Sequence, residues 1–262
     1  MNKTTKRLLG ILLLVSLSLQ GLSFYPTRSF GQEDMFTPGR LVYAIHDWSS
    51  VENEVFDLST TMKVNCPKHQ VTEYYWGVQF VFKNGNIGWF GMTSSCMGLG
   101  GGGFVFTICD AVSAEPSSEG YLSKNIEPGN GLSCVLPYEW NNGMEYRFTL
   151  TKNLPRTTST RICWSLQAEE IPTSQFIHIG DIFTAPQWDQ FYPWSSYFVE
   201  YFGPILDCKV MPRGTVTFHP LELTGQTNVP YSEIYITENC KNQTEVSFEK
   251  EEKIYIKTGS KY

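Results

Sequence analysis

The stretch from Glu73 to Asp110 constrains the fold of this chain more than any other. An Asn84-Gly85 pair separates two apolar, aromatic-rich segments, residues 74–82 and 87–92, and supplies the positive φ that a tight hairpin turn needs. A glycine run at residues 100–103 then precedes a third such segment, residues 104–109. These three segments predict the centre of an antiparallel β-sheet on which most of the core packs.

Alternating apolar and polar residues predict further strands on both sides of this stretch. The expected strands lie at residues 40–46, 58–66, 144–151, 161–168, 176–184, 197–202, 214–219, 233–237, 246–249 and 253–257. Residues 111–133 are rich in Gly, Pro, Ser and Asn and predict a long exposed loop. Residues 185–196 predict an aromatic connection with one helical turn. Many short strands without a convincing helix predict an all-β fold: an antiparallel β-sandwich, or a related jelly roll, formed by residues 32–262 as a single domain.

The N-terminus has the pattern of a secretory signal peptide. Lys3, Lys6 and Arg7 precede the apolar run Leu8 to Leu19, which is too short to span a bilayer comfortably. We therefore assign residues 1–31 to a signal peptide and lead-in, and expect a secreted, extracellular protein. The alternative is a signal segment that stays uncleaved, which would be the chain's membrane contact.

Without residues 1–31 the chain keeps 16 basic and all 26 acidic residues, a net charge of −10. Such an acidic surface repels phosphate backbones, which argues against nucleic acid as a partner.

All seven cysteines follow residue 31, where export implies an oxidising compartment. None is spaced C-x-x-C, which argues against a structural zinc site. An odd number leaves at least one thiol outside intramolecular disulfides, and we expect two or three disulfides with a buried free cysteine left over. Asn242-Gln243-Thr244 is a glycosylation sequon that matters only if the host glycosylates exported proteins.

Motifs for cofactors and nucleophilic catalysis are missing. The glycines from Gly98 to Gly103 formally satisfy G-x-G-x-x-G, but a strand-like segment follows them where a nucleotide fingerprint needs a helix. There is no G-x-S-x-G, and the four histidines lack the spacing of metal ligands. We predict no cofactor; calcium held by sandwich loops would leave no local motif and is not indicated by one.

Three carboxylates are considered as catalytic candidates, since glycoside cleavage needs two such groups across a cleft. Glu200 lies between Phe198 and Phe202 on one expected strand face, where it would be partly desolvated, as general acids often are. Asp110 and Glu73 lie at strand ends, where acids are usually solvated. Glu200 is thus the candidate catalytic residue, and a structural carboxylate tied to a backbone N–H or an arginine is the alternative.

Aromatic side chains are the other candidates. We predict that Trp188, Trp194, Tyr192 and Trp140 bind a ligand, because exposed flat rings stack on sugars. Trp188 and Trp194 lie among prolines and an aspartate, where exposure is expected. Core filling is the alternative for every ring.

Three segments together resemble a family of exported domains of unknown function, catalogued as number 3472. They are Tyr75–Met92 with the strand at residues 104–110, Tyr138–Phe148, and Ser196–Pro204. The resemblance covers roughly residues 70–218. It implies a secreted β-sandwich connected with carbohydrate and supplies no established catalytic residue.

Three functions follow as hypotheses. The first is non-catalytic binding of a glycan or a cell-surface partner through loop aromatics. The second is a carbohydrate-active hydrolase or lyase with Glu200 as acid or base. The third is a disulfide-stapled structural or adhesion domain. Missing catalytic motifs favour the first over the second.

Overall fold

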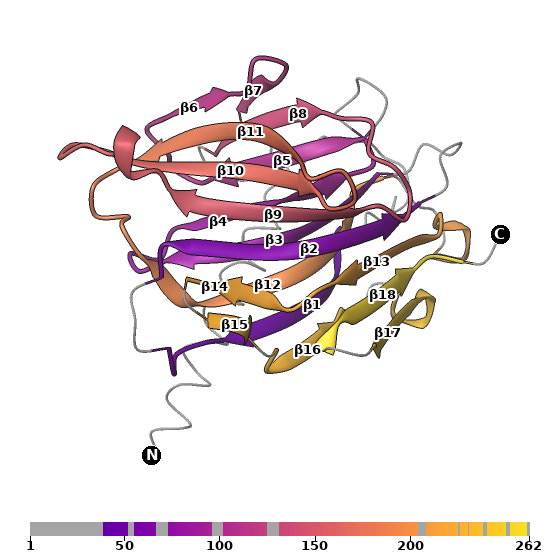
Figure 1. Cartoon of the computed structure of the whole chain (residues 1–262). Helices are drawn as coiled ribbons and strands as arrows, with labels where there is room; N and C mark the ends of the chain where they lie inside the picture. Colours follow the sequence, from indigo (N-terminus) through magenta and orange to yellow (C-terminus); the bar gives the residue numbers. More distant parts are fainter. Residues whose placement is uncertain are drawn as a thin grey trace, which may run out of the picture.

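The computed structural model of the chain describes residues 39–51, 55–66, 73–95, 102–124, 131–203, 208–224, 226–229, 231–237, 240–249 and 252–260. Within these ranges the chain forms two antiparallel sheets that face each other (Figure 1). The all-β sandwich expected from the sequence is confirmed. The expected signal peptide lies outside the described residues.

Eight strands form the first sheet. In spatial order they are β16 (Glu233–Ile236), β1 (Gly39–Asp47), β12 (Phe191–Tyr201), β3 (Tyr74–Phe82), β4 (Ile87–Thr93), β5 (Gly103–Ile108), β8 (Leu132–Pro137) and β7 (Tyr121–Lys124). The expected hairpin is therefore its centre, and every residue of β3 is buried. Gly85 adopts φ +91° in the turn between β3 and β4, a conformation that glycine adopts without steric cost.

Ten strands form the second sheet. Eight follow one path: β17 (Thr244–Phe248), β18 (Ile254–Thr258), β13 (Gly214–Phe218), β2 (Asp57–Asn65), β9 (Glu145–Lys152), β10 (Ile162–Glu170), β11 (Gln175–Thr184) and β6 (Ser113–Pro116). The short strands β14 (Leu221–Leu223) and β15 (Gln226–Val229) form a ribbon that pairs with β2. Within the described ranges, the 3₁₀ turns η2 (Leu154–Arg156), η3 (Cys208–Val210) and η4 (Lys241–Gln243) connect strands.

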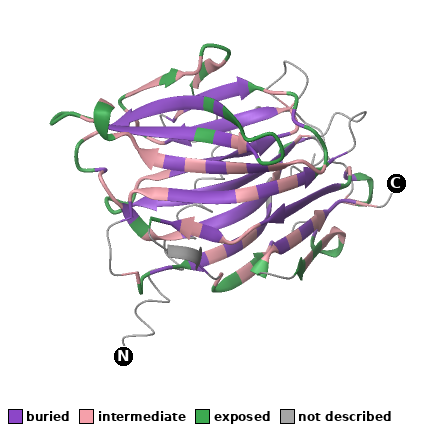
Figure 2. Cartoon of the chain, viewed as in Figure 1, coloured by how far each residue is buried: buried purple, intermediate pink, exposed green. Residues whose placement is uncertain are grey.

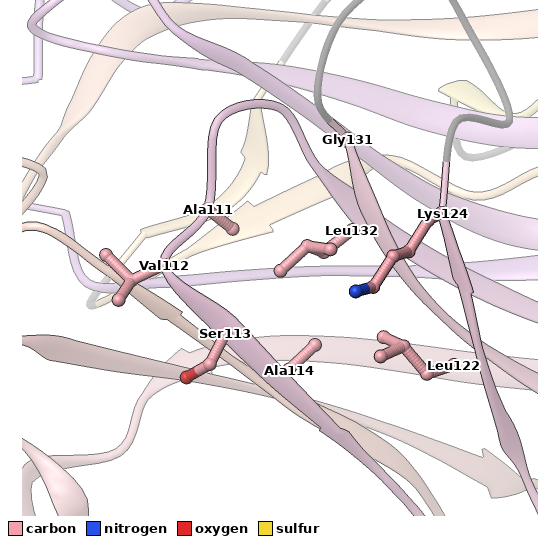
Figure 3. Close-up of a pocket in the computed structure, with 8 residues that line it drawn as sticks. All are labelled: Ala111, Val112, Ser113, Ala114, Leu122, Lys124, Gly131 and Leu132. Carbon is pink, nitrogen blue, oxygen red and sulfur yellow. The ribbon is translucent and has the colours of Figure 1, made fainter.

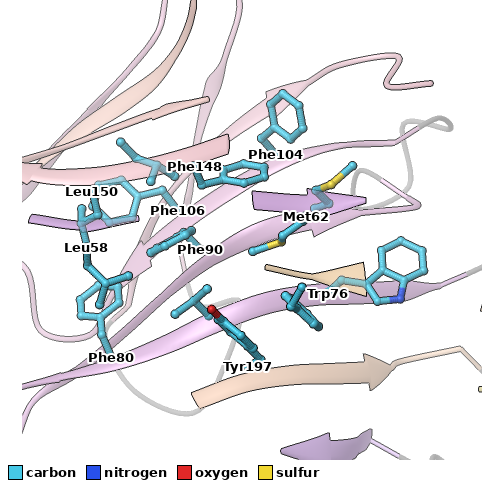
Figure 4. Close-up of a cluster of buried hydrophobic side chains, with 14 of the residues drawn as sticks. Leu58, Met62, Trp76, Phe80, Phe90, Phe104, Phe106, Phe148, Leu150 and Tyr197 are labelled. Atoms are coloured by element: carbon cyan, nitrogen blue, oxygen red, sulfur yellow. The ribbon is translucent and has the colours of Figure 1, made fainter. Parts of the chain in front are cut away.

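Large aromatic and aliphatic side chains fill the space between the sheets (Figure 4). Rings from opposite sheets meet directly: Phe104 lies 5.2 Å from Phe148, and Tyr197 stacks on Phe218 at 4.5 Å. Each fully buried large apolar side chain contributes about 1.5 to 3 kcal/mol. Figure 2 shows the result: burial concentrates along the central strands, while exposed residues gather in the turns and at the outer strands.

Two sequence predictions of irregular structure were wrong. Residues 111–133, expected to be an exposed loop, contain β6, β7 and the start of β8. Residues 185–196, expected to be a connection with a helical turn, contain the first part of β12. In both places prolines and serines suggested loops. β6 and β7 are outermost strands, where proline and polar residues are tolerated, and Pro193 of β12 lies where the pairing with β3 is interrupted between Phe191 and Ser195.

One disulfide joins Cys208 to Cys240, so part of the expected disulfide framework is confirmed. Cys134 and Cys163 are buried free thiols, as expected for at least one cysteine. Cys96 lies outside the described residues. Across the described ranges, no helix is long and apolar enough to cross a membrane.

Candidate functional site

Trp140 and Trp188, two of the four aromatic residues predicted to bind a ligand, lie in the core. Trp140 is 8% exposed, and its Nε1 donates a hydrogen bond to the carbonyl oxygen of Thr93 at 3.0 Å. Trp188 is 5% exposed, and its ring lies 5.5 Å from that of Phe82. The exposure expected for Trp188 is therefore wrong. The backbone N–H of Trp188 donates a hydrogen bond to the carbonyl oxygen of Ala185, and this turn brings the indole ring onto the core.

Tyr192 and Trp194, the other two predicted binding residues, remain open to a ligand at the start of β12. Tyr192 is 43% exposed, and Trp194 is half-buried. A β-bulge between Phe191 and Ser195 shifts the pairing of β12 with β3. The pairing with β1 continues into this segment as far as Trp194, which lies opposite Asp47.

The side chains of β12 that point away from the core belong to a face that we call the outer sheet face. Since successive residues of a strand point to opposite sides, the core positions of Tyr197 and Val199 place Ser196, Phe198 and Glu200 on this face. Trp194 continues the same alternation. The outer sheet face thus brings together Trp194 and the candidate carboxylate Glu200, which the sequence could not place relative to each other.

A polar row crosses the outer sheet face. In backbone register it runs Ser196, Gln79, Trp89, Thr107 and Ser133. All five are buried, and the hydroxyls of Thr107 and Ser133 hydrogen-bond at 2.7 Å. The hydroxyl of Ser196 makes no hydrogen bond within the described part of the chain. Alternate polar residues in strands that are buried on both faces are the sequence signal for this row.

An apolar row lies beside the polar one. Its buried members Phe198, Val105 and Val135 pack with Tyr75 and Trp89 in a cluster separate from the main core. Tyr43 of β1 packs against this cluster from the side of the sheet edge. The central strands are therefore buried on both of their faces.

Towards β16, the outer sheet face becomes exposed. Tyr43 is half-buried, Tyr235 is 44% exposed, and their rings lie 6.5 Å apart. We call Tyr43, Tyr192, Trp194 and Tyr235 the aromatic edge. Two exposed carboxylates accompany it, Asp47 opposite Trp194 and Glu233 opposite Ile45. Tyr43 and Tyr235 were not candidates from the sequence, since only the pairing of β16 with β1 brings them together.

Glu200 is half-buried near the end of β12, and its Cα pairs with those of Arg40 on β1 and Tyr75 on β3. The N–H of Phe202 donates to the carbonyl of Glu73, which extends this pairing. Glu73 therefore lies one diagonal step from Glu200, a Cα separation of about 7 to 8 Å. Its side chain packs against Gly203. The third carboxylate considered from the sequence, Asp110, is exposed in the turn after β5.

A charged network that sequence reasoning missed lies on the other sheet. Asp181 of β11 is buried; it receives hydrogen bonds from Ser165 and Arg156, and His178 Nε2 lies 3.7 Å from its Oδ2. Arg156 also binds Glu115 at 2.6 Å. Burial alone would raise the pKa of Asp181, but the contacts from His178 and Ser165 and the charge of Arg156 lower the pKa below its ordinary value. The sequence signal that could have identified this network is an aspartate within an otherwise apolar strand.

No group of three His, Cys, Asp or Glu side chains within the described ranges is placed to hold a metal ion. The histidines within the described ranges, His46, His178 and His219, each contact a different part of the fold. His46 is buried with its Nδ1 3.2 Å from the carbonyl oxygen of Val229, His178 faces Asp181, and His219 lies 3.5 Å from Glu145.

No protein-family model matches the chain, and no curated protein matches it in sequence. Similar solved structures include scytalido-glutamic peptidase with a transition-state analogue inhibitor and the same peptidase with a peptide-based transition-state analogue. Each has a TM-score of 0.49 and 14% identity, over 84% of this chain and 98% of that one. SCP-B, a peptidase of the eqolisin family in complex with the tripeptide Ala-Ile-His, has a TM-score of 0.45 and 13% identity, over 86% and 100% of the two chains. Identity at this level says nothing of a shared activity.

Proposed function

We propose that this protein is a binding module that captures carbohydrate on its aromatic edge. The observation that carries the proposal is the grouping of four partly exposed rings around β16, β1 and the start of β12. The strand register places three of them, Tyr43, Tyr235 and Trp194, on the outer sheet face. Aromatic rings present flat apolar area at little entropic cost, and the tyrosines add a hydroxyl at the rim. This is the chemistry that recognises the apolar face of a sugar ring.

The spacing of the rings suits an extended ligand. Tyr43 lies opposite Phe198, which is four residues along β12 from Trp194. At about 3.4 Å per residue, the Tyr43 and Trp194 positions are separated by about 13 to 14 Å along the strands. One sugar ring cannot cover both positions, so the proposed ligand is a polysaccharide or a long oligosaccharide.

Carboxylates beside the rings supply hydrogen-bond acceptors. Asp47 lies in register with Trp194, and Glu233 lies one row from Tyr235 on the same strand face. Ionised carboxylates accept hydrogen bonds from hydroxyl groups and repel anions. A neutral glycan therefore fits this edge better than a sulfated or phosphorylated one.

We propose that the module acts outside the cell. Residues 1–31 predict export, and the Cys208–Cys240 disulfide is of the kind that persists in oxidising compartments.

A screen of the purified protein against soluble and insoluble polysaccharides tests the proposal, with both retained protein and released sugar measured. Binding that Trp194→Ala and Tyr43→Ala each weaken about tenfold or more would support it. Phe176→Ala is the matched control, because Phe176 is 69% exposed on β11, away from the aromatic edge. If no polysaccharide retained the protein, or if Phe176→Ala lost as much binding as the other two variants, the carbohydrate proposal would be wrong. The search would then turn to protein partners.

A second candidate function, glycoside hydrolysis, is favoured by one observation: the diagonal placement of Glu73 beside Glu200. Glycosidases hold two carboxyl groups about 5 to 10 Å apart. Release of sugar in the same screen, lost in both Glu200→Gln and Glu73→Gln while retention persists, would establish this function. Binding without release in the wild-type protein would exclude it for the polysaccharides tested.

A further inference from the structure

A hollow opens between the two sheets at the edge of the sandwich opposite the aromatic edge. β7 is the last strand of the eight-stranded sheet, and β6 is the last strand of the ten-stranded sheet. The space between them has a volume of about 360 Å³ and is open to solvent (Figure 3). Small-molecule sites in proteins begin at about 300 Å³.

The lining of this hollow, which we call the edge hollow, is mainly apolar. Its side chains are Ala111, Val112, Ala114, Leu122 and Leu132, with Ser113 and Lys124 as the polar members. Val112 is 63% exposed and Leu122 is 39% exposed. Exposed apolar area that is grouped around a hollow is more informative than single exposed residues, because it marks a place where an apolar group would be sheltered from water.

Lys124 supplies the hollow with its cation. In the register of β7 with β8, Leu122 lies opposite Cys134 and Lys124 lies opposite Leu132. Cys134 belongs to the core, so this face of β7 is the one that points between the sheets. Figure 3 shows the Lys124 side chain extending across the hollow, with Nζ between Leu132 and Leu122. Lys124 makes no ion pair or hydrogen bond with any side chain in the described part of the chain.

We propose that the edge hollow binds a small aliphatic carboxylate. The hydrocarbon chain lies against Leu122, Leu132 and Ala114, and the carboxylate pairs with the ammonium group of Lys124. Charge complementarity selects this ligand. A cation without a partner among the described residues, at the rim of an apolar hollow, favours an anion attached to an apolar body over a neutral or cationic one.

Protection of the sheet edge is the competing role for Lys124. Inward-pointing charges on outermost strands hinder edge-to-edge pairing of two molecules. Under that role, removal of the charge would promote self-association and leave ligand binding unchanged. The two roles therefore differ in what a charge-removing variant does.

The test is a calorimetric titration of the full chain with decanoate below its micelle concentration, with decanol and decylamine as ligands of matched length. We expect decanoate to bind at least about tenfold more tightly than either, the size of one charge-assisted contact. Lys124→Met keeps the apolar stem and should remove this preference. Ala114→Phe should fill the hollow and weaken binding of every ligand. Lys63→Met, on β2 of the other sheet, is the matched control and should bind decanoate like the wild type.

Circular dichroism of each variant establishes that it is folded before binding is compared. Three results would overturn the proposal: no binding of decanoate at millimolar concentration, equal binding of decanoate and decylamine, or a Lys124→Met protein that keeps the preference for decanoate. The last result together with self-association of Lys124→Met would assign the lysine to edge protection.

Discussion

The ring of Phe198 lies directly on Gly77 of the neighbouring strand. A Cβ at residue 77 would meet Cζ of Phe198 at 2.8 Å and the carbonyl oxygen of Phe90 at 2.7 Å. The two residues are also partners in the backbone register of β12 and β3. Glycine at this position is therefore what lets the ring lie flat on the outer sheet face.

Gly77→Ala should destabilise the protein, because the added methyl group has no space between the ring and the backbone. We expect a loss of about 1 to 3 kcal/mol in the free energy of unfolding, measured by urea denaturation. Gly131→Ala is the control, since its nearest neighbour would be the Thr107 methyl group at an ordinary 3.6 Å. Equal stability of the two variants would contradict the packing described for Phe198.

Trp188→Ala should act on stability rather than on ligand binding. Its indole is buried against Phe82, and removing such a ring typically costs about 3 to 5 kcal/mol. Trp194→Ala removes a half-buried ring at the sheet surface and should cost clearly less. Thermal melting of the two variants compares these costs. A larger loss of stability in Trp194→Ala would mean that the core and surface assignments of the two rings are reversed.

The sequence predicted the sandwich because its strands carry regular signals. Asn84-Gly85 specified the central hairpin, and strict alternation marked β2, β9 and β10. These signals are local, so they can be recognised in the sequence without knowing which strand pairs with which. Edge strands β6 and β7 were missed because their short polar sequences resemble loops.

The candidate site was predicted less well, because it depends on pairing between distant segments. Tyr43 and Tyr235 are 192 positions apart in the chain, and only the register of β1 with β16 makes them neighbours. Trp188 and Trp194 have similar sequence surroundings, yet one faces the core and the other the surface. That difference arises from the turn at Ala185 and the bulge in β12, which residue types alone do not specify.

Cys134 and Cys163 should resist alkylation in the native protein. Burial raises the pKa of the Cys134 thiol to about 12 and that of Cys163 to about 11, so little reactive thiolate exists at pH 8. Mass spectrometry after treatment with iodoacetamide should find both unmodified in the native state and modified in urea. Rapid modification in native protein would show that these thiols are accessible.

Cys208→Ser should lower the free energy of unfolding, because it increases the conformational entropy of the unfolded chain. The disulfide spans 32 positions between η3 and η4, for which loop-closure entropy gives roughly 3 to 4 kcal/mol. Reduction of the wild-type protein should lower its melting temperature similarly, whereas reductant should leave Cys208→Ser unchanged. A further drop in the variant on reduction would point to a second stabilising disulfide.

Asp181→Asn should change how stability depends on pH. The pKa of Asp181 is lowered in the folded protein from an ordinary value of 3.8, because His178, Ser165 and Arg156 favour its ionised form against the cost of burial. A lowered pKa means that Asp181 contributes stability above about pH 4 and that this contribution is lost as the pH falls through the folded pKa. Asp181→Asn should therefore cost about 1 to 3 kcal/mol at pH 7 and weaken the loss of stability on acidification.

Urea denaturation between pH 2 and pH 7 measures this dependence. Asp110→Asn is the control, because Asp110 is exposed and asparagine tolerates its φ of 52°. If Asp181→Asn and Asp110→Asn gave the same pH profile as the wild type, the acid sensitivity would have to reside elsewhere, and the network around Asp181 would contribute no net stabilisation to the sheet.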